Sequence, residues 1–205
     1  QPGAVDPGQI VAHALFADAA AAVVLTPDGD GYEMCDVVSL TDPTTADHMT
    51  WDVTDAGFRM GLSPRVPEVL GRYVGQVLTD LLAGAGLHPT DVPGWAVHPG
   101  GPQILDVVQR ELGLPAAALA PSRSVLAGYG NCSSPTVLII LNELRRAAAP
   151  PYVAMTAFGP GLTLYAALLR RSGAGEPRRR RGRRLTAAGA APGPAGRSVP
   201  RSCGW

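Results

Sequence analysis

Two predicted strand–turn–helix units in the second half of the chain restrict the fold more than any other feature. In the first unit, the short apolar run 94–97 is typical of a buried strand, and a turn leads from it to a helix over 102–113. In the second unit, a strand at 124–127 is followed by a turn and by a helix over 134–148. Strands that alternate with helices predict an α/β fold with a layered sheet, rather than a helical bundle or an all-β sandwich.

The preceding residues are predicted to add further strands and one long helix. Strands are expected at 22–25 and 32–40, on either side of the turn TPDGDG, whereas residues 40–62 have the polar character of a loop. The Ser-Pro pair at 63–64 has the form of a helix start, and apolar residues then recur at helical spacing from 66 to 82.

Residues 147–169 carry no charge and lie between two pairs of arginines, as a membrane-spanning helix would. However, Pro150, Pro151 and the turn at 159–161 (Gly-Pro-Gly) would interrupt such a helix and leave backbone groups unpaired in lipid. We therefore expect two buried strands joined by this turn, which form a hairpin that closes the sheet.

Charge divides the chain into an acidic body and a basic tail. All 17 basic residues are Arg, and most of them fall after residue 169, where Glu176 is the one acidic residue. Residues 171–205 are also rich in Gly, Ala and Pro, so we expect a disordered, Arg-rich tail. Cys35, Cys132 and Cys203 are odd in number and widely spaced, which suggests no disulfide framework and favours the cytoplasm.

His98 and Asn131 occupy equivalent places, since His98 directly follows a predicted strand and Asn131 precedes a predicted helix. In open α/β sheets, the carboxyl ends of strands and the neighbouring helix N-termini form the ligand crevice. There an imidazole and a carboxamide can donate two hydrogen bonds to one developing oxyanion. A purely structural role in the two turns is the alternative.

Several motifs of this chain resemble those of the type III polyketide synthases, the chalcone and stilbene synthase family. They are ALFADAAAAVVL, WAVHPGGPQILD, SRSVLAGYGNCSSPTVLIILNELR and AFGPGLT, in this order. The resemblance implies a thiolase-like fold, in which two similar α/β halves form each subunit of a homodimer. It further implies that 1–25 is a remnant of the N-terminal half, which is otherwise missing here, and that 26–170 is the C-terminal domain.

The same resemblance implies an acyltransferase with a Cys–His–Asn site, in which His98 and Asn131 match the family's catalytic His and Asn. The Cys accepts a starter acyl group from coenzyme A, and malonyl-CoA then loses carbon dioxide and extends that group. Coenzyme A thioesters are the implied substrates, with no metal and no resident cofactor. The nucleophilic Cys of the family lies upstream of the first residue, and Cys132 is expected to be a small buried side chain.

Six further residues are implied to bind substrate. Phe16 and Met60 match the two side chains that flank the pocket mouth, and Ser133 lines the pocket. Phe158, Gly159 and Pro160 match the loop that shapes the cavity in which the product cyclises.

Other functions remain open on the sequence. A condensing enzyme similar to ketoacyl-ACP synthase III would use the same fold, although HPGG differs from its His motif. A catalytically inactive fragment is a second alternative, and binding of the Arg-rich tail to nucleic acid is a weaker third. The starter unit, the number of extensions and the mode of cyclisation depend on pocket shape, so the sequence leaves them undetermined.

Overall fold

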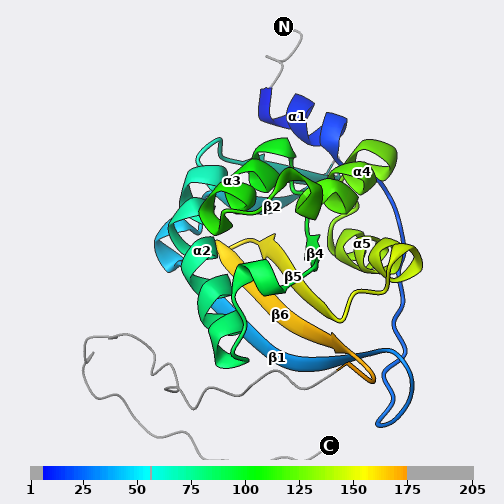
Figure 1. The fold of residues 1–205 in the computed structure, drawn as a ribbon. Coiled ribbons are helices and arrows are strands. Elements are labelled where there is room, and N and C mark those ends of the chain that lie inside the picture. The colour runs from blue at the N-terminus through cyan, green and yellow to red at the C-terminus, as the bar shows by residue number, and fades with distance from the viewer. Residues whose placement is uncertain (1–6, 56, 175–205) are drawn as a thin grey trace, which may run out of the picture.

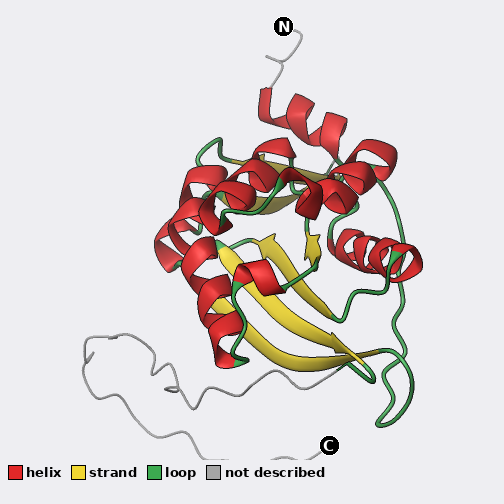
Figure 2. Cartoon of the chain, in the orientation of Figure 1, coloured by secondary structure: helices red, strands yellow, loops and turns green. Residues whose placement is uncertain are grey.

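The computed structural model describes residues 7–55 and 57–174, which form an α/β domain built on a four-stranded sheet (Figures 1 and 2). The strand order is β1-β6-β5-β4, where β4 is parallel to β5 and the other neighbours are antiparallel. The strands are β1 (Tyr32–Thr41), β4 (Gly94–Val97), β5 (Tyr152–Gly159) and β6 (Thr163–Arg171). The predicted Arg-rich tail lies, from residue 175 on, outside the described residues.

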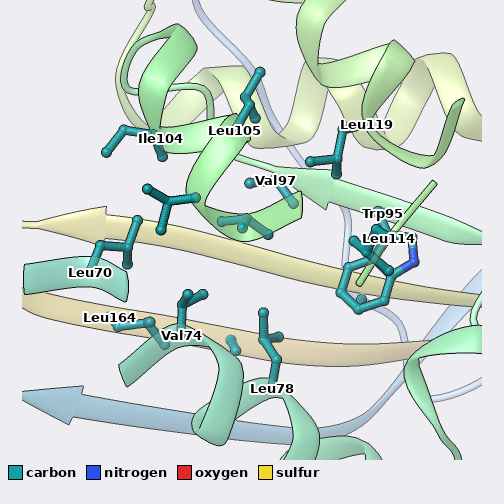
Figure 3. Packing of buried hydrophobic residues seen from close by; sticks show 14 of the residues in the cluster. Leu70, Val74, Leu78, Trp95, Val97, Ile104, Leu105, Leu114, Leu119 and Leu164 are labelled. Atoms are coloured by element: carbon teal, nitrogen blue, oxygen red, sulfur yellow. The ribbon is translucent and has the colours of Figure 1, made fainter. Parts of the chain in front are cut away.

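Helices cover both faces of this sheet. On one face lie α2 (Val66–Gly84) and α3 (Pro102–Leu112), and on the other α4 (Ala120–Tyr129) and α5 (Ser134–Ala147). Side chains of β4 alternate between the two faces, as expected for a strand buried on both sides. Trp95 and Val97 join the core beneath α2 and α3, which Figure 3 shows, whereas Ala96 faces α4 and α5.

A second, smaller sheet is formed by the segment between β1 and α2. It is a hairpin of β2 (Met49–Thr54) and β3 (Gly57–Leu62), and α1 (Pro7–Leu15) packs on β3. The side-chain amide Nε2 of Gln9 donates to the carbonyl oxygen of Met60 at 2.5 Å and fixes α1 on the hairpin. Short 3₁₀ helices connect the elements: η1 (Pro43–Thr45), η2 (Pro89–Asp91) and η3 (Ala116–Leu119).

Most predicted elements are confirmed, including the strands at 32–40 and 94–97, the helix over 102–113 and the closing hairpin. The strand predicted at 124–127 is wrong, because these residues lie within helix α4. Ser122 and Val125, three positions apart, form the buried face of that helix. A four-residue apolar run is too short for its periodicity to separate a strand from a helix.

The prediction of a strand at 22–25 is also wrong. Val23, Val24 and Leu25 are exposed, and no described strand pairs with them. High β-propensity does not produce a strand where no neighbouring strand accepts its backbone hydrogen bonds.

The loop predicted over 40–62 is instead the end of β1, the helix η1 and the β2–β3 hairpin. Apolar and polar residues alternate over 49–54, which is typical of a strand with one exposed face. Gly61 leaves room for Thr50 on the opposite strand, because a Cβ atom at this position would lie 2.3 Å from Oγ1 of Thr50 unless that side chain rotated.

The predicted start of one helix is shifted. Helix α2 begins at Val66 with Arg65 as N-cap, because the Ser63-Pro64 pair forms a turn before it. Helix α5 begins at Ser134, the first residue of the predicted helix, with Ser133 as N-cap. Differences of one or two residues are common because helix ends fray.

The uncharged segment 147–169 runs from the end of α5 through β5 and into β6, as predicted. Among the described residues, no helix has the length and hydrophobicity needed to span a membrane.

Replacing Ser122 with Ala should lower the free energy of unfolding by about 1–3 kcal/mol. The backbone N–H of Val97, on edge strand β4, donates to Oγ of the fully buried Ser122 at 3.2 Å, and Ala would leave it without an acceptor. Ser124→Ala, an exposed position on the same helix, is the matched control. Urea denaturation measures both variants, and equal stabilities would contradict the assignment.

Candidate active site

The carboxyl end of β4, the α4–α5 junction and the β5–β6 turn meet at a cavity of about 890 Å³. Helix α1 and the β2–β3 hairpin form the remaining walls. All eight residues predicted for the site line this cavity: Phe16, Met60, His98, Asn131, Ser133, Phe158, Gly159 and Pro160. The fold therefore brings together residues that are up to 144 positions apart in the sequence, as the span from Phe16 to Pro160 shows.

His98 is held by the sheet and by the turn that follows it. Its backbone N–H donates to the carbonyl oxygen of Thr156 on β5 at 2.8 Å, and its carbonyl oxygen accepts from the N–H of Gly100 at 3.1 Å. A Cβ atom on Gly100 would lie 4.0 Å from Cδ2 and Nε2 of the imidazole, so the ring lies beside this glycine. No described residue forms a hydrogen bond with the ring nitrogens.

Burial sets the protonation state of this imidazole. Only 8% of His98 is exposed, and the loss of solvation lowers its pKa from about 6.5 to about 4. The ring is therefore neutral at neutral pH, with one nitrogen that donates and one that accepts. The sequence alone does not determine whether the ring is neutral or charged.

Asn131 lies beside the same turn, because its amide Nδ2 donates to the carbonyl oxygen of Gly100 at 3.4 Å. Its Oδ1 accepts from the backbone N–H of Ser133 at 2.9 Å, which fixes the orientation of the amide. Asn131 is only 3% exposed, and the second N–H of its amide has no acceptor within the described part of the chain. Gly100 thus lies between the two predicted catalytic side chains, against the His98 ring and bonded to the Asn131 amide.

The backbone around Asn131 is shaped by its neighbours on both sides. Gly130 has a positive φ of 76°, and a Cβ atom there would lie 3.1 Å from the carbonyl oxygen of Leu15. Glycine therefore lets the end of α1 approach, where Asn131 N–H donates to Leu15 O at 2.7 Å and Ala17 N–H donates to Asn131 O at 3.0 Å. Ser133 has a φ of 58°, a conformation unusual for a residue with a side chain and often found at functional sites.

The same backbone contacts bring Phe16 to the cavity wall. Its ring meets that of Trp51 edge to face, with centroids 6.1 Å apart and an interplanar angle of 74°. Trp51 pairs with Met60 across the β2–β3 hairpin, and Met49 pairs with Leu62; all four line the cavity.

Sequence reasoning missed Trp51, Met49 and Leu62 because it treated residues 40–62 as a loop. The sequence did contain a strand signal, because apolar residues are two positions apart in both halves of the hairpin, at 49 and 51 and at 60 and 62. Gln103 and Ile104, at the start of α3, also line the cavity and were not predicted.

Neither described cysteine lines the cavity. Cys132 is buried, and its Sγ lies 3.4 Å from the carbonyl oxygen of Tyr129. Cys35 lies on β1 and is exposed as a residue. Partial loss of solvation at its thiol raises the pKa, and the nearby positive charge of Arg170 offsets part of this increase. A thiol with a raised pKa is a poor nucleophile at neutral pH.

The arrangement supplies two neutral hydrogen-bond donors in a mostly apolar enclosure. An N–H of neutral His98 and the second N–H of Asn131 are suited to stabilise negative charge that develops on a bound oxygen atom. Such donors act more strongly beside buried, mostly apolar walls than in bulk water, because the local dielectric constant is lower.

Solved structures identify the class to which this fold and site belong. A fungal type III polyketide synthase, ORAS, superposes with a TM-score of 0.63 and 29% sequence identity, over 68% of this chain and 41% of its own. A type III pentaketide synthase from Neurospora crassa gives a TM-score of 0.65 and 27% identity, over 72% and 43%. The described residues are therefore part of a thiolase-like α/β fold, as predicted.

Sequence comparisons narrow the assignment from a fold to a family. The profile of chalcone and stilbene synthases, C-terminal domain, matches residues 36–172. The 1,3,6,8-tetrahydroxynaphthalene synthase of Streptomyces peucetius subsp. caesius is 37% identical over 173 residues, which cover 78% of this chain and 45% of that protein. The chain belongs to the chalcone and stilbene synthase family. It spans less than half the length of the relatives described above.

Proposed function

We propose that this chain provides the His–Asn part of the active site of a type III polyketide synthase. The observation that carries the proposal is the buried His98 and Asn131, which meet at Gly100 on the wall of one cavity in a chain of this family. The reaction is decarboxylation of malonyl-CoA followed by condensation with a Cys-bound acyl group. Family membership favours this function over that of a ketoacyl-ACP synthase III-like enzyme.

In the first step, the bond between the α-carbon and the carboxylate of the malonyl group breaks and carbon dioxide leaves. The electron pair passes to the thioester, which becomes an enolate with negative charge on its oxygen. The N–H groups of His98 and Asn131 are placed to bind that oxygen and so lower the energy of the transition state. A neutral imidazole still carries one N–H, so His98 can donate to the enolate oxygen although burial lowers its pKa to about 4.

In the second step, the enolate carbon attacks the carbonyl carbon of the Cys-bound thioester, and the Cys thiolate leaves. This thiol belongs to the half that the family resemblance places upstream of residue 1. A thiolate beside His98 would stabilise the imidazolium and raise its pKa, so that the two groups form an ion pair before loading. The apolar cavity walls suit the growing polyketide chain. The resemblance implies a homodimer, and the number and spacing of the cysteines favour the cytoplasm.

Residues 1–205 purified alone should show no condensation of malonyl-CoA, because neither described cysteine lines the cavity. The comparison is a full-length version, in which a Cys-bearing N-terminal half precedes these residues. Release of carbon dioxide and polyketide product, measured by mass spectrometry, reports the activity of each. Product from 1–205 alone would contradict the need for the upstream Cys, and a full-length version without either activity would reject the proposed function.

A further inference from the structure

The tip of the β5–β6 hairpin is tied to a segment outside the hairpin. The backbone N–H of Leu162 donates to Oγ1 of Thr45 at 2.7 Å, and its carbonyl oxygen accepts from the N–H of Asp42 at 3.0 Å. Both partners belong to the turn that leads from β1 into η1. Leu162 is buried, so these two bonds replace the hydrogen bonds that water would make.

The hydroxyl group of Thr45 both donates and accepts a hydrogen bond. Oγ1 donates to the carbonyl oxygen of Asp42 at 2.8 Å, and the N–H of Leu162 is only a donor, so Oγ1 accepts from it. Thr45 is itself buried. Among the hydrogen bonds of the described residues, Thr45 supplies the one side-chain bond from η1 to Leu162. The hydroxyls of Thr41, on β1, and Thr163 form a neighbouring bond at 3.0 Å.

Asp42 holds the turn in the conformation that Thr45 needs. Its Oδ1 accepts from the N–H and from Oγ1 of Thr44, at 3.0 and 2.6 Å, and its Oδ2 accepts from the hydroxyl of Tyr73 at 2.8 Å. Only 8% of Asp42 is exposed. The bonds from Thr44 and Tyr73 lower the pKa of this carboxyl group, aided by the charge of Arg72, and keep it ionised at neutral pH.

This anchor adjoins the wall of the candidate active site. Phe158, Gly159 and Pro160 line the cavity, and Leu162 follows them after one residue. That residue, Gly161, is closely packed, since a Cβ atom there would lie 2.6 Å from Oγ1 of Thr163. Tyr73 belongs to α2, whose first turn lines the same cavity, so Asp42 links two of its walls.

We propose that Asp42 and Thr45 are positioning residues that fix the Phe158–Pro160 wall, and that they thereby set the space available to the growing polyketide. The proposal rests on the proposed function, since it concerns the product that the same cavity forms. Neither residue lines the cavity, so they act through Leu162 and not by touching substrate.

The first test measures the anchor itself in this chain by hydrogen exchange of backbone amides. Thr45→Val keeps the shape of the side chain but removes the hydroxyl, so exchange at Leu162 should accelerate by about tenfold or more. Thr45→Ser restores the hydroxyl and should restore protection. Thr44→Val is the matched control, because it removes a hydroxyl that bonds to Asp42 and not to Leu162, while the N–H of Thr44 still donates to Asp42. Amides of α3 report whether each variant is folded, and unchanged exchange at Leu162 in a folded Thr45→Val would overturn the proposal.

The second test measures the consequence in the full-length version. Thr45→Val should change the ratio of chain lengths and of cyclised to linear products at least severalfold, while Thr45→Ser and Thr44→Val retain the original ratio. The rate of malonyl-CoA decarboxylation should stay unchanged in all three, because the anchor does not contact His98 or Asn131. An unchanged product ratio in an active Thr45→Val variant would overturn the positioning role. If the unsubstituted full-length protein makes no polyketide, the proposed function is wrong and the product ratios cannot be measured. The hydrogen-exchange measurement at Leu162 still decides whether the anchor exists.

Discussion

Asn131→Asp in the full-length version should lower the rate of malonyl-CoA decarboxylation by about 100- to 1000-fold, the usual effect of removing one donor from an oxyanion site. Asp keeps the oxygen that accepts from the N–H of Ser133 at 2.9 Å, so the start of α5 should remain in place. It loses both N–H groups of the amide, including the one without an acceptor among the described residues, and adds a negative charge where the enolate oxygen would lie. The change therefore separates the chemical role of Asn131 from its structural one.

His98→Ala and Asn131→Ala should each lower the same rate by a similar factor, because each removes one donor. Cys132→Ala is the matched control, since Cys132 adjoins Asn131 in the sequence but does not line the cavity. Its rate should stay within about twofold of the original, as expected for a change outside the site. Rates measured by release of carbon dioxide at saturating malonyl-CoA decide the matter, and near-normal rates in either His98→Ala or Asn131→Ala would end the oxyanion proposal.

The stability of residues 1–205 should fall by about 3 kcal/mol relative to a His98→Gln variant when the pH is lowered from 6.5 to 4. Burial lowers the pKa of His98 to about 4 in the folded chain, whereas the unfolded chain titrates near 6.5. Between these values the unfolded state binds a proton that the folded state does not, so acid favours unfolding. Further than about one pH unit above 6.5 or below 4, this group contributes no further change.

His98→Gln removes the titrating group and keeps a neutral polar side chain, so the difference between the two proteins isolates His98 from the carboxylates. The pKa of Asp42 is lowered by its hydrogen bonds to Thr44 and Tyr73, so its contribution is lost only below about pH 3.8. Urea denaturation at half-unit pH intervals gives the two stability curves. Parallel curves between pH 6.5 and 4 would show that His98 is not buried as described. That result would also contradict the role of neutral His98 as a hydrogen-bond donor in the proposed mechanism.

The sequence predicted the strands and helices well where the hydrophobic pattern of a segment and the residues at its ends indicated the same element. The strand at 94–97 is apolar throughout, and the helix after it begins at Pro102 and ends at Gly113, which has the left-handed conformation expected of a helix cap. The hairpin was predicted from the turn at 159–161. At 124–127 the apolar run was too short to separate a strand from a helix, and at 40–62 the polar residues suggested a loop. In both segments, packing against the rest of the chain determined the secondary structure.

The site divides in the same way. Motif resemblance selected His98 and Asn131, but their joint contact with Gly100 follows from the close approach of three segments, which no local pattern encodes. Trp51 belongs to the cavity only because β2 pairs with β3 and places it against Phe16. The link from Thr45 to Leu162 joins residues 117 positions apart, so only the folded chain reveals it.

By itself, the sequence determined the α/β class, the family resemblance and the residue types able to bind a developing oxyanion. These depend on composition, spacing and motifs, which are properties of neighbouring residues. The tertiary structure decided the charge state of His98, the shape of the cavity and the anchor of its wall. Each of these depends on burial or on contacts between distant segments, and solvation and hydrogen bonding there are set by which segments the fold brings together.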